Sequence, residues 1–209
     1  MIQFAIRFQE FIKLLVLTKI SALRVLLLSK FGTKFKKSLL HNECIILGNG
    51  PSLNASIENH IEFIEKRDLF AVNYFANSKL FLELKPRFYV ILAPELWSDT
   101  PSERIEKMRA DLFVSIAKAD WELYFYIPHF AKKSLFWKPI FESKKNISIV
   151  YFNPTPIEGF EFWNFWFYKK NLGMPRPHNV LTPCLMFAIA QQYSHIYLLG
   201  ADHSWLNEI

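Results

Sequence analysis

Short apolar runs alternate with helical patterns along most of this chain. The runs are rich in β-branched and aromatic residues, which is typical of buried strands. They cover residues 44–48, 69–73, 88–92, 122–127, 147–152 and 195–199. The spacing of apolar residues predicts helices over 54–66, 79–84, 102–118 and 183–192. The aromatic-rich stretch 157–168 favours neither element.

Strands that alternate with helices predict an α/β fold, with an open, mostly parallel, Rossmann-like sheet and flanking helices. We expect this domain over residues 43–209 and a basic, amphipathic helical segment over residues 1–40 before it. A length of 209 residues fits one domain with an appendage. Apolar residues make up 51% of the chain, which is enough to build a core.

The N-terminal segment is apolar but is interrupted by basic residues every five or six positions over residues 13–30. A spanning helix needs roughly 20 mostly apolar residues, so this pattern argues against one. On a helical wheel one face is polar and holds Gln3, Arg7, Glu10, Ser21 and Arg24. Away from that face lie Phe4, Phe8, Phe11, Ile12 and Leu15. The segment is therefore either a helix lying in the plane of a membrane surface or a helix docked on protein.

The positive charge of the chain is concentrated in the same segment. Residues 1–40 hold eight basic side chains and one acidic side chain, a net charge of +7, so the other 169 residues together carry −1. The main domain is thus not a basic nucleic-acid binder, and we expect no nucleic-acid partner. Attraction to anionic headgroups predicts a cytoplasmic protein, peripheral on the inner face of the cytoplasmic membrane. Cys44 and Cys184 lack motif spacing, which indicates a reducing compartment and no disulfide.

Three polar clusters follow predicted strands, where ligands of parallel α/β sheets bind. The first is GNGPSL, residues 48–53, whose glycines permit a tight turn close to a ligand. Unpaired N–H groups at the start of the next helix attract phosphate. We expect Asn49, Gly50 and Ser52 to hold phosphate or ribose, and a plain strand–turn–helix junction is the alternative.

The second cluster is Asn73, where dinucleotide-binding folds place a ribose-binding acid. An asparagine donates and accepts hydrogen bonds, so Asn73 suits a ribose or a base edge, or it stabilises the turn. The third cluster is DHSW, residues 202–205. Asp202 and His203 are candidate catalytic residues, with His203 as general base, and a hydrogen-bonded loop is the alternative.

The strings CIILGNGPSL (44–53), VNYF (72–75) and HIYLLGADHSW (195–205) carry a family resemblance. They resemble the bacterial lipooligosaccharide sialyltransferases and related capsule and surface-polysaccharide glycosyltransferases with a Rossmann-like (GT-A-like) fold. The resemblance implies inverting, metal-free transfer from a CMP-sugar-like donor to a glycan or glycolipid acceptor, with no cofactor. It assigns nucleotide contacts to Asn49, Gly50, Ser52 and Asn73, a place near the donor phosphate to Asn179 and Thr182, and a role in shaping the site to Asp202.

Two other function classes stay open. The glycine turn and the late Gly-x-Asp also look like proteins related to archaeal hydroxymethylpterin pyrophosphokinases. Their chemistry needs carboxylates to hold Mg²⁺, and this chain offers Asp202 and then Glu95. A non-catalytic nucleotide-binding protein is the third class. It is motivated by the stop at Ile209 shortly after the last predicted strand, from which we expect the domain to be truncated at its C-terminus.

Overall fold

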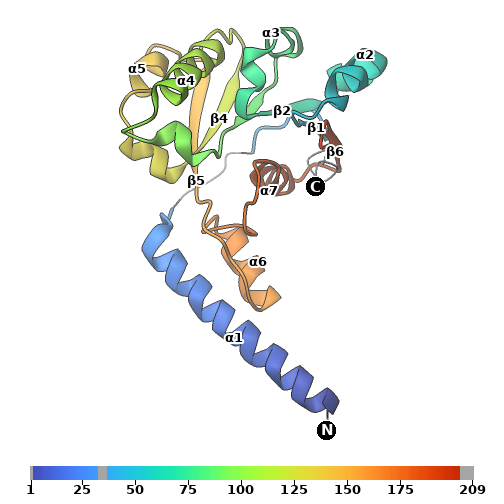
Figure 1. Ribbon diagram of the computed structural model, residues 1–209. Helices are drawn as coiled ribbons and strands as arrows, with labels where there is room; N and C mark the ends of the chain where they lie inside the picture. Colours follow the sequence, from blue (N-terminus) through green and yellow to red (C-terminus); the bar gives the residue numbers. More distant parts are fainter. Residues whose placement is uncertain (1, 33–36, 203–209) are drawn as a thin grey trace.

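The structure, a computed structural model, describes residues 2–32 and 37–202 and shows an α/β domain with a long N-terminal helix (Figure 1). Within these residues one open sheet has six strands in the order β5-β4-β3-β2-β1-β6, and every pair is parallel. The strands are β1 (Glu43–Leu47), β2 (Asp68–Val72), β3 (Phe88–Val90), β4 (Leu123–Pro128), β5 (Ile147–Phe152) and β6 (His195–Leu199). The predicted open parallel sheet is therefore confirmed.

Both faces of the sheet are buried. Successive side chains of a strand point to opposite faces. On β1, Ile45 and Leu47 belong to one apolar cluster, whereas Cys44 and Ile46 belong to another on the opposite face. Strands buried on both faces read as continuous apolar runs, which is why the runs of the four central strands β1 to β4 were recognisable in the sequence, whereas the edge strands β5 and β6 are only partly buried.

The helices divide between the two faces according to the direction of the chain. The connections from β1 to β5 pack on one face, and the return from β5 to β6 covers the other. Right-handed crossovers between parallel strands produce this division, since reversing the direction moves the helix to the opposite face. The helices are α1 (Ile2–Leu28), α2 (Ser52–Glu65), α3 (Leu80–Leu84), α4 (Glu103–Ile116), α5 (Lys138–Phe141), α6 (Glu161–Lys169) and α7 (Leu181–Gln191). The described residues also form three short 3₁₀ helices: η1 (Asn73–Asn77), η2 (Pro94–Trp97) and η3 (His129–Lys133).

The order of the strands changes direction next to β1. The chain runs outward from β1 through β5 and then returns to place β6 on the other side of β1. Leu47 and Leu199, the last residues of β1 and β6, are paired in register. Ligands of open α/β sheets bind at such a switch point, beyond the carboxyl ends of the strands.

Helix α1 projects from the domain and makes its hydrogen bonds to it through its C-terminal half (Figure 1). The Ser21 hydroxyl donates to the carbonyl of Glu158 and accepts from its N–H, both at 2.8 Å. Arg24 Nη1 pairs with Glu158 Oε2 at 3.0 Å. Phe160 N–H donates to Thr18 Oγ1 at 2.9 Å. Ser21 and Arg24 of the predicted polar face thus meet the protein together with the buried Val25, whereas Gln3, Arg7 and Glu10 are exposed.

The opposite side of α1 is apolar and exposed. It presents side chains three or four residues apart, namely Phe8, Ile12, Val16, Ile20, Leu23 and Leu27. Most of the stretch 157–168, which favoured neither element in the sequence, forms helix α6. This helix also has exposed apolar side chains, namely Phe162, Trp163, Phe165 and Trp166. Surface helices ordinarily turn their apolar side inward, so α1 has the reverse orientation. Within the described residues, no helix is long and apolar enough to cross a membrane.

Candidate functional site

Backbone hydrogen bonds join the turn after β1 to the end of β6. Gly48 N–H donates to the carbonyl of Leu199 at 2.7 Å, and Gly50 N–H donates to that of Gly200 at 2.9 Å. A Cβ atom added to Gly48 or Gly50 would lie 2.3 or 2.6 Å from the Gly200 oxygen, closer than real contacts allow. The glycines are therefore required first for the approach of two strand ends to each other.

Asp202 adds a contact between the β1–α2 turn and the end of β6, a junction that we call the seam of β1 and β6. Its Oδ2 accepts hydrogen bonds from the Ser52 N–H at 2.9 Å and from the Ser52 hydroxyl at 2.7 Å. Ser52 begins α2, where N–H groups lack intrahelical partners and a negative charge is favourable. The carboxylate of the protein itself thus lies at the helix start where the sequence suggested a phosphate.

A hollow of about 280 Å³ lies at this seam. Its lining comes from the β1–α2 turn, the end of β2, the start of α7 and the end of β6. Five residues proposed from the sequence meet there: Asn49, Gly50, Asn73, Asn179 and Asp202. Ser52 touches this group through Asp202. Residues from four separate segments therefore converge on one concave site.

Asn73 is the most constrained residue of this hollow. It follows β2 instead of ending the strand, and its φ of 45° is left-handed, a conformation that asparagine tolerates better than most residues. The hydroxyl of the buried Tyr89 donates to the Asn73 carbonyl at 2.5 Å and accepts from Ala76 N–H at 2.8 Å. Asn73 Oδ1 is buried and has no hydrogen-bond partner among the described residues. An unpaired buried acceptor is costly, so a rotation of the Asn73 side chain that turned Oδ1 toward the hollow, where a ligand could donate to it, would relieve that cost.

A second hollow, of about 460 Å³, adjoins the first. Asn73, Asn179 and Val180 line both, so the two form one cleft that continues past the ends of β3 and β4. Glu95 lies on the wall of the second hollow, together with His178. The sequence had suggested Glu95 as a weak candidate, whereas His178 carried no signal apart from its position in the proline-containing loop before Asn179.

The start of α7 faces this cleft. Asn179 Oδ1 accepts the N–H of Leu181, the first residue of α7, at 3.0 Å, which fixes the Asn179 side chain just before the helix. Leu181 lines the smaller hollow, whereas Thr182 lies in the first helical turn and does not line it. Helix starts favour anionic groups, which makes this end of the cleft electrostatically suitable for a phosphate.

The two cysteines lie buried away from the cleft. Cys44 and Cys184 are free and fully buried, on the face of the sheet that α7 covers. Burial raises the pKa of the Cys44 thiol to about 12 and that of Cys184 well above its ordinary value, so both are neutral and poor nucleophiles. Over residues 2–32 and 37–202, no group of three or more His, Cys, Asp or Glu side chains is arranged to hold a metal ion.

The candidate general base, His203, lies outside the described residues. Its neighbour Asp202 is placed at the cleft, hydrogen-bonded to Ser52. No protein-family model, curated protein or solved structure matches this chain. The fold alone does not define an activity, because unrelated functions occur on the same α/β fold.

Proposed function

We propose that this protein is a glycosyltransferase that binds a nucleotide-sugar, of the CMP-sugar type, at the seam of β1 and β6. The acceptor is a glycan or glycolipid at a membrane surface. The observation that carries the proposal is the convergence of Asn49, Asn73 and Asn179 in one cleft at the switch point of a parallel sheet. Three amides offer donors and acceptors without adding charge, which suits a nucleoside.

The contacts within the cleft suggest how a donor lies. The unpaired Asn73 Oδ1 accepts from a ribose hydroxyl or a base amino group, with Asn49 beside it. The phosphate lies at the start of α7, near Asn179. It avoids the start of α2, because the carboxylate of Asp202 already occupies that place and would repel it. The sugar then extends into the larger hollow that His178 lines.

Asp202 and His203 stay our candidates for the chemistry. The two hydrogen bonds from Ser52 fix the Asp202 carboxylate beside the cleft, where it positions the following residue or the substrate. His203 is the proposed general base, taking a proton from the acceptor hydroxyl as the sugar transfers. Substituting His203→Ala should then lower turnover much more than donor affinity. Equal losses of both would make His203 a binding residue.

The proposal that the protein acts at a membrane surface depends on α1. Part of its polar face is used by the domain, its apolar face is exposed, and the segment 1–40 carries a net charge of +7. An exposed apolar stripe flanked by basic residues fits the boundary between headgroups and acyl chains of an anionic membrane. We therefore place the protein on the cytoplasmic surface of the membrane, peripherally bound.

The test is a thermal-shift screen of the whole chain against CMP, UDP, GDP and their sugars, with and without Mg²⁺. A ligand that binds the folded state raises the melting temperature by mass action. We expect a metal-independent shift with cytidine nucleotides. Asn73→Ala should weaken binding by roughly tenfold, the value of one good hydrogen bond, whereas Asn77→Ala, an exposed amide of the same short helix, should not.

Other outcomes separate the alternatives. Absence of a shift with every nucleotide would overturn the proposal. Strict dependence on Mg²⁺ would favour pyrophosphoryl transfer, with Asp202 and Glu95 as the first carboxylates to substitute. Normal nucleotide affinity without turnover, even with membrane acceptors present, would favour a non-catalytic binding protein.

A further inference from the structure

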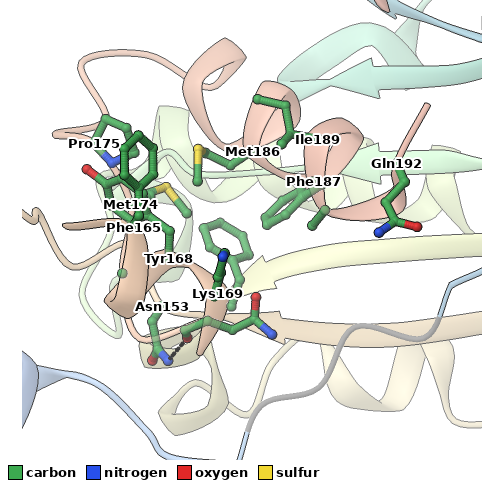
Figure 2. Close-up of a pocket in the computed structure, with 14 residues that line it drawn as sticks. Asn153, Phe165, Tyr168, Lys169, Met174, Pro175, Met186, Phe187, Ile189 and Gln192 are labelled. Atoms are coloured by element: carbon green, nitrogen blue, oxygen red, sulfur yellow. Dashed lines mark hydrogen bonds between the residues drawn. The ribbon is translucent and has the colours of Figure 1, made fainter. Parts of the chain in front are cut away.

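A third cavity lies between α6 and α7, separate from the nucleotide cleft (Figure 2). Its volume is about 580 Å³, within the range of small-molecule sites. Most of its lining is apolar, including Phe165, Tyr168, Met174, Met186, Phe187 and Ile189. Methionine and aromatic side chains adapt to flexible apolar ligands, so the cavity suits a hydrocarbon chain.

Basic groups lie at the same cavity. Lys169 of α6 lines it, and its ammonium has no carboxylate partner among the described residues. Lys37 Nζ donates to Gln192 Oε1 at 2.9 Å, and Gln192 is also part of the lining. An apolar interior with ammonium groups beside it matches an amphiphile that has a hydrocarbon chain and an anionic head.

The cavity borders the exposed apolar surface of α6, which in turn adjoins α1. Phe165 lines the cavity and is also 59% exposed, so one ring borders both the interior and the outer surface. α6 adjoins α1 through the rings of Phe160 and Phe11, whose centroids are 5.4 Å apart, and through a small cluster that includes Val25 and Phe167. A chain leaving a bilayer beneath α1 and α6 therefore has an apolar route into the cavity.

A single loop separates this cavity from the nucleotide cleft. Met174 and Pro175 line the cavity between α6 and α7, while His178 and Asn179, a few residues later, line the cleft. A lipid held in the cavity would thus lie one loop away from the donor cleft.

We infer that the cavity between α6 and α7 binds the hydrocarbon chain of a phosphate-bearing membrane lipid, which presents the acceptor. Identifying the lipid as the acceptor rests on the proposed function, whereas the capacity to bind an alkyl phosphate does not. The apolar lining holds the chain, and Lys169 pairs with the phosphate.

The test uses the full chain and alkyl phosphates, below the concentrations at which they form micelles, in isothermal titration calorimetry. We expect saturable binding of one decyl phosphate, weakening by roughly fourfold for each methylene removed. Ala190→Trp, which fills the cavity from α7, should lower affinity at least tenfold. The matched control is Ala110→Trp, an exposed alanine of α4 on the other face of the sheet, and it should bind normally.

A comparison of decyl phosphate with decanol separates the contribution of the charged head from that of the hydrocarbon chain. Lys169→Gln should weaken decyl phosphate but leave decanol unaffected. The inference is overturned if wild-type protein shows no saturable binding, or if a folded Ala190→Trp variant binds as wild type. If Ala190→Trp fails to fold, the series of alkyl phosphates on wild-type protein still tests the inference. An affinity that does not depend on the length of the alkyl chain would overturn it. Changes in melting temperature with nucleotides, measured on the same protein preparation, show separately whether the proposed function holds.

Discussion

Replacing Tyr89 by phenylalanine tests whether one buried hydroxyl holds the turn that presents Asn73. The hydroxyl bridges the Asn73 carbonyl and the Ala76 N–H, at 2.5 and 2.8 Å. Phenylalanine keeps the ring contacts with Phe81 and Phe125, whose centroids lie 5.6 and 5.9 Å away, so no cavity forms. The loss is therefore one of hydrogen bonding alone.

The expected loss of stability depends on which group the substitution leaves unpaired. The Asn73 carbonyl borders the open cleft and can be hydrated, whereas Ala76 is buried and its N–H loses its acceptor. An unsatisfied buried N–H costs about 1–3 kcal/mol, so the free energy of unfolding should fall by that amount. For a chain of this size the melting temperature should drop by about 2–10 °C. Nucleotide-induced stabilisation should fall as well, since the left-handed turn at Asn73 loses its support.

Urea denaturation provides the assay. We expect a lower midpoint with an unchanged m-value, because the folded state stays compact. Tyr151→Phe is the control, since the Tyr151 hydroxyl on β5 has no hydrogen bond with any described residue. Equal stability losses in the two variants would show that the Tyr89 hydroxyl does not hold the turn. So would a Tyr89→Phe variant with unchanged stability and unchanged nucleotide binding.

Two further substitutions test the seam and the docking of α1. Asp202→Asn should destabilise the protein by about 1 kcal/mol in thermal melts, because Ser52 loses a charged acceptor at the start of α2, and an unchanged melting temperature would contradict this. Hydrogen bonds from Arg176 and then Arg24 lower the pKa of Glu158. Its stabilisation is therefore complete above the ordinary glutamate pKa and is lost as pH falls through the lowered one. The protection factors of the α1 amides, which correct the exchange rates for slower intrinsic exchange at low pH, should fall on acidification in wild type, and Glu158→Gln should remove that pH dependence.

The sheet was predictable because its central strands are buried on both faces. Runs such as 44–48 and 69–73 could not be solvent-exposed, and the intervening helical patterns left a parallel sheet as the simplest arrangement. Helix α6 was not predictable, because apolar aromatic residues surround it on nearly every side and only Phe167 is fully buried. Its pattern reflects an exposed apolar surface instead of a core-facing stripe.

The candidate site was predictable only as a set of strand ends. Asn49 and Asn73 follow adjacent parallel strands, so their proximity follows from the topology. The pairing of Ser52 with Asp202 depends on β6 returning to β1, a contact between residues 150 positions apart that no local pattern encodes. The orientation of α1 was equally hidden, since a helical wheel defines two faces but not which one meets the protein.

The seam between β1 and β6 also determines when the site can exist during folding. Strands β1 to β5 pair in the order in which they occur in the chain, but β6 must find β1 across most of the domain. Closing such a long loop is entropically costly and slow. Until β6 pairs, the N–H groups of Gly48 and Gly50 lack their acceptors and the cleft lacks a wall. Nucleotide binding would therefore report the last step of assembly. In a refolding experiment, the signal from ligand binding should appear later than the signal from helix formation.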